Sequence, residues 1–374
     1  MKSLFKYICC IAAFLPLAAC VGSEEPAGPL RTRVEGIDVE FDLDPSASDN
    51  GVLDDYFIDG RSVILISQRG DHLSIDFNES TVDSEGNEIP NGNLYKYVYY
   101  SNPAANWEDY YNFQPYGNRA LDWAFIANDR LNGEYALGAL YYPVEYNIYN
   151  SVETDQSSYE NLLRSNVLGA WHRINAVKTR LRFRFNHLME AMRVTLLIPD
   201  WDPADNSGFG PDAAASGTLL GVIKDFYIDW PLNNSTELPP NAQFIAGGEP
   251  CDILMYPESV VNEPETVNFH EITSSFPDVE ERVRKATFVV LFPPQQPATT
   301  AMRFVLKTMG GMEKNYVWNT NNMYDGTLDS KGGRVNNIVL YLPRKNVDAI
   351  LIKAHIMDWI EAESEFTVIP DDAD

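Results

Sequence analysis

Residues that could perform chemistry are few in this chain, and they lack the spacing that known reactions need. The nearest approach to a zinc-binding helix is His270-Glu271-Ile272-Thr273-Ser274, where a histidine adjoins a carboxylate. A second histidine one helical turn later is missing, so two imidazoles cannot converge on one metal ion. We therefore expect His270 to be a surface or loop residue. The sequence also has no Gly-x-Ser-x-Gly, phosphate-loop or dinucleotide-binding motif.

Carboxylates could supply two further kinds of chemistry. The segment 200–208, Asp-Trp-Asp-Pro-Ala-Asp-Asn-Ser-Gly, carries the hard oxygen ligands that calcium prefers, but its spacing does not match an EF-hand. We expect a solvated acidic loop there. Glycoside hydrolysis needs two carboxylates at a set separation, and nothing in the sequence selects two of the 54 acidic residues. The sequence therefore predicts that the protein is not an enzyme and needs no cofactor or metal.

The elements that would have to position any such residues are β-strands. Apolar and polar residues alternate with a period of two, which is typical of half-buried antiparallel strands. The alternating segments are Val63–Ile66, Tyr95–Tyr99, Leu181–Phe185, Arg193–Ile198, Thr287–Phe292 and Ile338–Leu342. One helix is predicted over 158–168, where Tyr159, Leu162, Leu163 and Val167 share a face. Many short strands predict an all-β fold, and this length predicts two β-sandwiches.

Charge and composition exclude several classes of protein. The 374 residues include 28 Lys and Arg against 54 Asp and Glu, a formal net charge of -26. Nucleic acid is excluded as a partner because phosphate binding needs a cationic surface. A disordered acidic polymer is excluded as well, since 45% hydrophobic residues can build large cores.

The N-terminus has the pattern of an export signal. Lys2 and Lys6 precede a short apolar stretch, residues 8–17, which is too short to span a bilayer as a helix. Leu17-Ala18-Ala19-Cys20 resembles the bacterial lipobox, which predicts a lipidated Cys20 and a signal peptide over 1–19. The alternative is an ordinary secretory cleavage near Ala19, which would also export the chain.

A tether follows the predicted lipidation site. Residues 20–33 are polar and rich in Pro and Gly, and they end near Arg31 and Arg33. Two basic residues in such a segment form either an accessible protease site or two solvated charges. We expect one domain over 34–187 and a second over 188–374, with the boundary least well determined.

Cysteine and tryptophan each allow a structural and a functional interpretation. After loss of the signal and lipidation of Cys20, Cys251 stands alone, so the chain cannot form an internal disulfide framework. We expect Cys251 to be a small buried side chain. The seven tryptophans could stack on sugars, but most lie in alternating segments, which favours the core.

A series of motifs covers about residues 60–360. They combine a tyrosine strand, spaced tryptophans, a strand ending in Tyr-Pro and another ending in Pro-Gln. These motifs are Tyr95–Tyr99 with Trp107, Leu121–Trp123, Tyr135–Pro143, Asn166–Ala170, Leu181–Leu196, Phe288–Gln296, Tyr316–Trp318, Gly332–Leu340 and Ala354–Trp359. In order and spacing the sequence resembles the fimbrillin family, the lipoprotein pilins of Bacteroidetes. Glu190 departs from the family pattern, because small residues are usual at its position.

The resemblance implies two tandem transthyretin-like or Ig-like Greek-key β-sandwich domains in a structural pilus subunit or adhesin. Such subunits reach the outer membrane surface and are cut by an arginine-directed protease, and they then assemble by strand exchange with other subunits. Arg31 and Arg33 are the candidate cleavage positions, and Val34–Leu43 is either the first retained strand or the strand removed. The tail with Phe366, Val368 and Ile369 is a candidate donor strand, or else a frayed acidic terminus.

Two other functions remain open from the sequence alone. A surface glycan-binding lipoprotein of a polysaccharide-uptake system would use the same lipid anchor, sandwiches and aromatic residues. A hydrolase is the third alternative. In the pilus interpretation the partners are other subunits, the outer membrane through the lipid on Cys20, and a host or bacterial surface ligand.

Overall fold

Strands dominate the structure, a computed structural model, and confirm the all-β class. It describes residues 38–43, 57–59, 61–67, 81–82, 88–89, 94–99, 113–115, 135–142, 150–174, 180–200, 209, 215–229, 243–272, 274, 278, 280–295, 301–319, 333–343 and 350–358. Two short helices, α3 (Tyr159–Arg164) and α4 (Phe269–Ile272), lie in these ranges. Within the same ranges, no helix combines the length and apolar character needed to cross a bilayer.

The strands have the following bounds. They are β1 (Asp38–Leu43), β2 (Ser62–Ser67), β3 (Thr81–Val82), β4 (Glu88–Ile89), β5 (Leu94–Tyr99), β6 (Phe113–Pro115), β7 (Tyr135–Tyr142), β8 (Asn150–Ser151), β9 (Leu168–Ile174), β10 (Arg180–His187), β11 (Glu190–Pro199), β12 (Ala215–Ile223), β13 (Asp225–Asp229), β14 (Gln243–Ala246), β15 (Pro250–Leu254), β16 (Tyr256–Asn268), β17 (Glu280–Phe292), β18 (Ala301–Lys307), β19 (Glu313–Asn319), β20 (Arg334–Tyr341) and β21 (Ile350–Asp358). All six alternating segments predicted from the sequence fall on strands, with Leu342 just beyond the end of β20.

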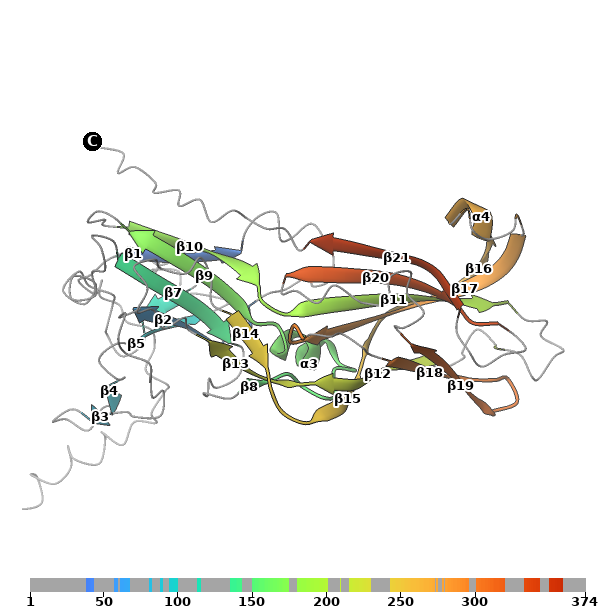
Figure 1. Cartoon of the computed structure of the whole chain (residues 1–374), viewed down its shortest axis with the longest axis horizontal. Coiled ribbons are helices and arrows are strands. Elements are labelled where there is room, and N and C mark those ends of the chain that lie inside the picture. Colours follow the sequence, from blue (N-terminus) through green and yellow to red (C-terminus); the bar gives the residue numbers. More distant parts are fainter. Residues whose placement is uncertain are drawn as a thin grey trace, which may run out of the picture.

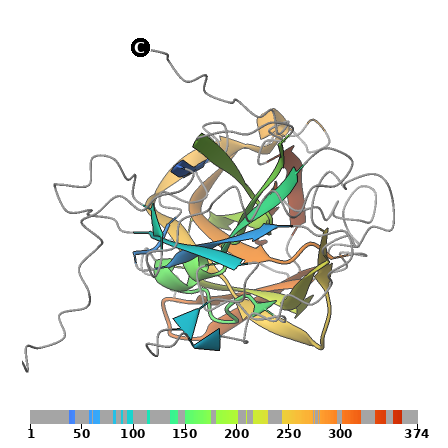
Figure 2. The same ribbon diagram turned by 90° about the vertical axis from the view of Figure 1, so that its left-hand side faces the viewer.

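One half of the elongated molecule is built on a seven-stranded sheet, ordered β1-β10-β9-β7-β2-β5-β6 (Figure 1). Its neighbours are antiparallel except β1, which runs parallel to β10. Viewed along the long axis from this half, the blue, cyan and green strands lie in front (Figure 2). The alternation along β10 buries Leu181, Phe183 and Phe185, which are at most 3% exposed.

The other half contains two facing sheets. One has the order β16-β17-β11-β20-β21 and the other β15-β12-β18-β19. Leu196, Phe288 and Ile338 from the first sheet share one apolar core with residues of the second. Those facing residues are Leu219, Ile253, Met302, Phe304, Leu306, Tyr316 and Trp318. Trp318 is 1% exposed, so the expectation of a core position is confirmed for this tryptophan.

Helix α3 covers the opposite face of the five-stranded sheet. Ser158 caps it by accepting the N–H of Asn161 (3.3 Å), and Leu162 and Leu163 pack on a cluster that includes Val289 and Leu291. The helix ends at Arg164, earlier than the predicted residue 168. The N–H groups of residues 165 and 166 bond to the carbonyls of Leu162 and Leu163, a tight turn that closes the helix. The chain then enters β9.

The segment 150–167, between β7 and β9, crosses from one half to the other. Val152 joins the core of the facing sheets, and β8 pairs with β13 in a three-stranded sheet ordered β14-β13-β8. The predicted domain boundary at residue 187 falls between β10 and β11, and it stays a prediction. We call residues 150–167 the clasp, because this stretch of the first half is packed into the second.

Candidate functional site

The residues predicted to carry function lie outside the described residues. These are the lipidation site Cys20, the cleavage candidates Arg31 and Arg33, and the donor-strand candidates Phe366, Val368 and Ile369. The described parts of the molecule instead contain two features that bear on function. One is the pairing of β1 at a sheet edge, and the other is the polar junction between the halves.

Strand β1 closes one edge of the seven-stranded sheet. It pairs with β10 through six consecutive residues, from Asp38 opposite Arg180 to Leu43 opposite Phe185. The register that joins β10 to β9 covers two residues, 186 and 187. Along 180–185, β1 therefore supplies the backbone partners that a buried strand requires. The first described strand, beginning five residues after Arg33, is thus a structural part of the sheet edge.

A short polar junction joins β10 to β11. The Nδ1 atom of His187 lies 2.8 Å from the Oδ1 atom of Asn166, and both side chains are buried. Next along the chain, the N–H of Leu188 donates to the carbonyl of Val167 (2.9 Å). Leu188 also packs so closely on β9 that a Cβ atom added at Gly169 would lie 2.5 Å from its Cδ1 atom. These contacts fix the direction in which the chain enters the second half.

Glu190 continues this junction into the five-stranded sheet. Its side chain is fully buried and accepts a hydrogen bond from the Nδ2 atom of Asn336, 2.5 Å away. The carbonyl of Met189 accepts from the N–H of Gly333 (2.9 Å). The residue that departs from the family pattern is therefore a buried polar link between β11 and β20, which pair in parallel.

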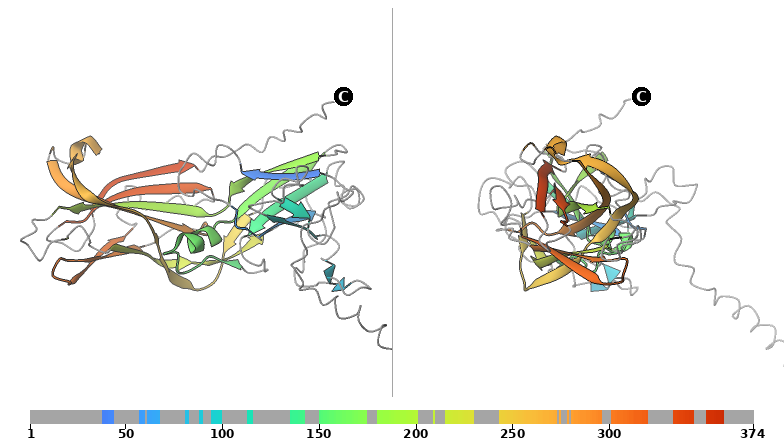
Figure 3. Two further views of the ribbon diagram at one scale, coloured as in Figure 1. Left: turned by 180° about the vertical axis from the view of Figure 1, so that it is seen from behind. Right: turned by 90° about the vertical axis from the view of Figure 1, so that its right-hand side faces the viewer.

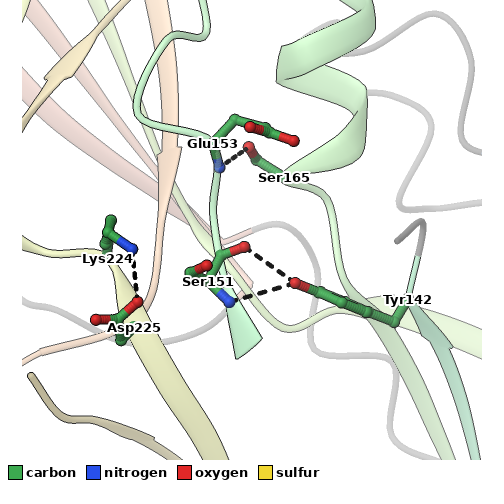
Figure 4. A network of polar contacts seen from close by, with 6 residues as sticks. All are labelled: Tyr142, Ser151, Glu153, Ser165, Lys224 and Asp225. Atoms are coloured by element: carbon green, nitrogen blue, oxygen red, sulfur yellow. Dashed lines mark hydrogen bonds and ion pairs between the residues drawn. The ribbon is translucent and has the colours of Figure 1, made fainter. Parts of the chain in front are cut away.

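The clasp forms a second polar network between the halves (Figure 4). The Tyr142 hydroxyl donates to the carbonyl of Ser151 (3.0 Å) and accepts from its N–H (3.3 Å). The Ser165 hydroxyl accepts from the N–H of Glu153 (3.1 Å), while the Lys224 ammonium lies 2.8 Å from the Asp225 carboxylate. Burial raises the pKa of Tyr142 to about 12, so its hydroxyl keeps its proton. The hydroxyl groups of Tyr142 and Ser165 in this network hold backbone groups in place.

Gln156 makes the longest-range contact of the clasp. It is fully buried, and its Nε2 donates to the carbonyl of Leu291 (2.8 Å) while its Oε1 accepts the N–H of the same residue (2.9 Å). Strand β16 starts to pair with β17 at Val289, so Leu291 lies beyond the end of that ladder. One side-chain amide thus replaces a strand residue. The sequence has no local signal for this role, because Gln156 lies in a polar stretch that resembles an ordinary loop.

The structure also describes three residues that the sequence offered as candidates for metal binding or reactivity. His270 lies in α4 and is exposed, as expected. Asp200 forms ion pairs with Arg284 (2.7 Å) and Arg282 (3.5 Å), and residues 201–208 are outside the described ranges. Cys251 is half-buried against the core, and burial raises the pKa of its thiol, which disfavours the reactive thiolate. In the described part of the chain, no three His, Cys, Asp or Glu residues come together as a metal site.

Comparison with known proteins gives matches to solved structures. Neither a family model nor a curated protein matches the chain. One similar structure is a protein of Bacteroides uniformis with a proposed role in cell adhesion, at 13% identity, covering 89% of this chain and 100% of that one, with a TM-score of 0.46. Another, from Bacteroides ovatus and described in the same way, has 12% identity, coverage of 88% and 99%, and a TM-score of 0.45.

A third similar structure is a fimbrial protein from Bacteroides vulgatus, at 10% identity, covering 87% of this chain and 99% of that one, with a TM-score of 0.40. The first two are described as cell adhesion proteins and the third as a fimbrial protein.

The buried His187 predicts a stability that falls with acid. Burial lowers the pKa of His187 to about 3, whereas an unfolded histidine titrates near 6.5. As the pH falls below 6.5, His187 is protonated in the unfolded chain but stays neutral in the folded chain. The free energy of unfolding therefore decreases. Between pH 7 and pH 5 this one group should cost roughly 2 kcal/mol of unfolding free energy.

Urea unfolding of the parent and of His187→Gln at both pH values measures this loss. The variant should lose less stability than the parent between the two pH values, whatever its stability at pH 7. The exposed His270→Gln serves as the matched control for the replacement of a histidine by glutamine. An unchanged pH dependence in His187→Gln would show that this histidine titrates in the folded protein as in the unfolded chain.

The amide of Gln156 should be worth more than an ordinary polar contact. Gln156→Ala removes both partners of Leu291 inside the protein, and each buried group left unpaired costs roughly 1–3 kcal/mol. We expect a loss of roughly 2–5 kcal/mol in urea unfolding. Ser157→Ala, next to it in an exposed position, is the control. A change in Gln156→Ala as small as that in the control would contradict the assigned role.

Proposed function

We propose that this protein is a structural subunit of a surface pilus, or an adhesin of the same build, that assembles by strand exchange between subunits. The observation that carries the proposal is the pairing of β1 as the parallel edge strand on β10. A strand at a sheet edge near the chain start can leave without unthreading the fold. The edge it vacates can then accept a strand from a neighbouring subunit.

The energetic reason for such an exchange lies in β10. Its side chains Leu181, Phe183 and Phe185 belong to the buried core, so the strand is held in place on its apolar side. Loss of β1 would leave the backbone groups of 180–185 without their partners along one edge. Each unpaired group costs free energy comparable to a lost hydrogen bond. A strand donated in trans restores these bonds, and the same pairing that completes the subunit links it to the next.

The position of the protease cut decides whether β1 is released. Arg31 and Arg33 precede β1, so a cut at either one trims the tether and leaves β1 attached to the rest of the chain. Between β1 and β2 the only basic residue is Arg61. Its N–H bonds to the carbonyl of Ile58 (3.1 Å) and its carbonyl accepts from Tyr99 (2.8 Å). We propose that trimming at 31 or 33 comes first, and that β1 leaves after a second cut at Arg61.

The remaining parts of the proposal rest on the motifs of the sequence. The precursor carries lipid on Cys20 and is held on the outer membrane, exposed at the cell surface, and the processed subunit becomes part of the fimbria. Its two halves are proposed as tandem Greek-key sandwiches, and the tail with Phe366, Val368 and Ile369 as the donated strand. Trp318 is buried, so it cannot serve as a sugar-stacking platform in the alternative glycan-binding function.

Limited digestion with an arginine-directed protease tests the proposal. The purified chain should give a product that starts at residue 62 and then assembles into ladders or rods, because the edge of β10 is then open. Mass spectrometry of the N-terminus and electron microscopy measure the two outcomes. In the control Arg61→Gln, trimming at 31 and 33 should still occur, but the ladders or rods that follow the loss of β1 should not form.

Two results would contradict the proposal. A product that has lost β1 yet stays a monomer would show that the edge of β10 does not accept a strand. Saturable binding to a polysaccharide by the uncut chain, without any assembly after cutting, would favour the glycan-binding function.

A further inference from the structure

Strand β19 has a regular edge in the second half of the molecule, and among the described strands it pairs with β18 alone. It pairs with β18 through seven consecutive residues, from Ala301 opposite Asn319 to Lys307 opposite Glu313, without a register shift. The N–H of Thr308 donates to the carbonyl of Met312 (2.8 Å), which identifies this pair as hydrogen-bonded. Bonded pairs alternate in an antiparallel ladder. The backbone groups of residues 313, 315, 317 and 319 therefore point outward, away from β18.

Three other edges among the described sheets carry known protective devices. Strand β16 has two register shifts and carries Glu258, Glu263 and Glu265. Strand β6 has three residues and ends in Pro115. The end of β15 is covered by the clasp, since Leu254 bonds to Thr154 (2.8 Å) and Gln156 (2.9 Å). Bulges, charges, proline and covering segments are the usual means of preventing strand addition. The edge of β19 carries none of these along its seven paired residues, apart from the charges of Glu313 and Lys314.

The side chains of β19 leave its edge accessible. The Lys314 ammonium, which could block it, lies 5.3 Å from the centre of the Phe209 ring, on the core side of the strand. Val317, on the outer face, is 37% exposed. An apolar, β-branched residue at an exposed position of an edge strand favours pairing with another strand.

The turn between β18 and β19 presents two methionines in a fixed conformation. Met309 is 44% exposed and Met312 is 62% exposed. Thr308 organises the turn, because its hydroxyl accepts the N–H of Met312 (3.1 Å) and its carbonyl accepts that of Gly311 (2.9 Å). Gly311 has a φ of 80°, a left-handed conformation that favours glycine. Exposed methionines adapt readily to an apolar partner.

The hairpin is basic in an acidic protein. Residues 301–319 contain Arg303, Lys307 and Lys314 against Glu313, a net charge of 3 − 1 = +2. The whole chain carries -26, so the remainder carries -26 − 2 = -28. A second copy of this chain therefore offers an acidic surface that complements the hairpin. Two hairpins placed edge to edge would instead bring like charges together.

The hairpin lies at the end of the long axis opposite the seven-stranded sheet (Figures 1 and 3). A contact between this end and a different surface of a second copy is heterologous. Such contacts leave each copy with one further free end, so they build open chains instead of closed dimers. This position thus suits an elongated assembly.

We propose that the outer edge of β19 and the Met309–Met312 turn bind an extended acidic segment of a second copy of this chain. The segment adds as a strand to the outward groups of residues 313–319, and its apolar side chains contact the two methionines. Arg303 and Lys307, both exposed, attract its carboxylates. The inference rests on the proposed function, to which it adds a second contact between subunits that needs no cleavage.

Sedimentation velocity of the uncut chain tests this contact. The parent should associate with rising concentration into open-ended oligomers, and raising the salt from ~50 mM to ~500 mM should weaken the association because the charges are screened. Val317→Pro removes an outward N–H, a change that edge strands tolerate, and should weaken association about tenfold. Val317→Thr keeps the N–H and should associate like the parent.

A double variant tests the contribution of charge to this contact. Arg303→Glu combined with Lys307→Glu should also weaken association and remove its dependence on salt. Parent and variants should share the same circular dichroism spectrum and melting temperature within a few degrees, which separates loss of contact from loss of fold. Hydrogen exchange should show slower exchange at residues 315 and 317 in the associated state.

Several outcomes would overturn the inference. A parent that stays monomeric, a Val317→Pro variant that associates as well as the parent, or a closed dimer would each do so. Binding of the hairpin to anionic vesicles without self-association would identify a membrane as its partner. Assembly of cut chains beside monomeric uncut chains would remove this contact and leave the pilus proposal intact. Association of uncut chains without assembly after cutting would support this contact and contradict the pilus proposal.

Discussion

The requirement that buried backbone groups find hydrogen-bond partners governs this molecule. Each half is a set of sheets around apolar side chains, and where a strand of such a sheet is buried its N–H and C=O groups need partners. At β10 the partner is the first strand of the chain. At Leu291 it is one side-chain amide, that of Gln156. These two solutions differ in kind, since the first is a strand at the edge of a sheet while the second is a side chain built into the core.

The clasp makes the two halves interdependent. Because Val152 joins the core of the facing sheets and α3 covers the outer face of one of them, the second half is completed by residues that precede it in the chain. The junction at His187 and Glu190 adds a second connection with buried polar links on both sides. The two halves are therefore joined through several parallel connections instead of a single linker.

The sequence predicts the local features of this fold well. Alternation in segments such as Leu181–Phe185 and Thr287–Phe292 depends on neighbouring residues, so all six predicted strands are found. The helix at 159–164 is also found, although it ends early because the turn at 165–166 closes it. The parallel pairing of β1 and the role of Gln156 join residues far apart in the chain, and no local pattern encodes either one. The predicted lipidation, cleavage and donor-strand residues lie outside the described part of the chain.

The long-range contacts of the clasp and of the junction also have a consequence for how the chain acquires its fold. Gln156 and Leu291 are 135 residues apart, and Glu190 and Asn336 are 146 apart. During synthesis from the N-terminus, these hydrogen bonds can therefore form only after the last third of the chain is present. Contacts of such long range make folding slow and leave apolar surface open in the meantime.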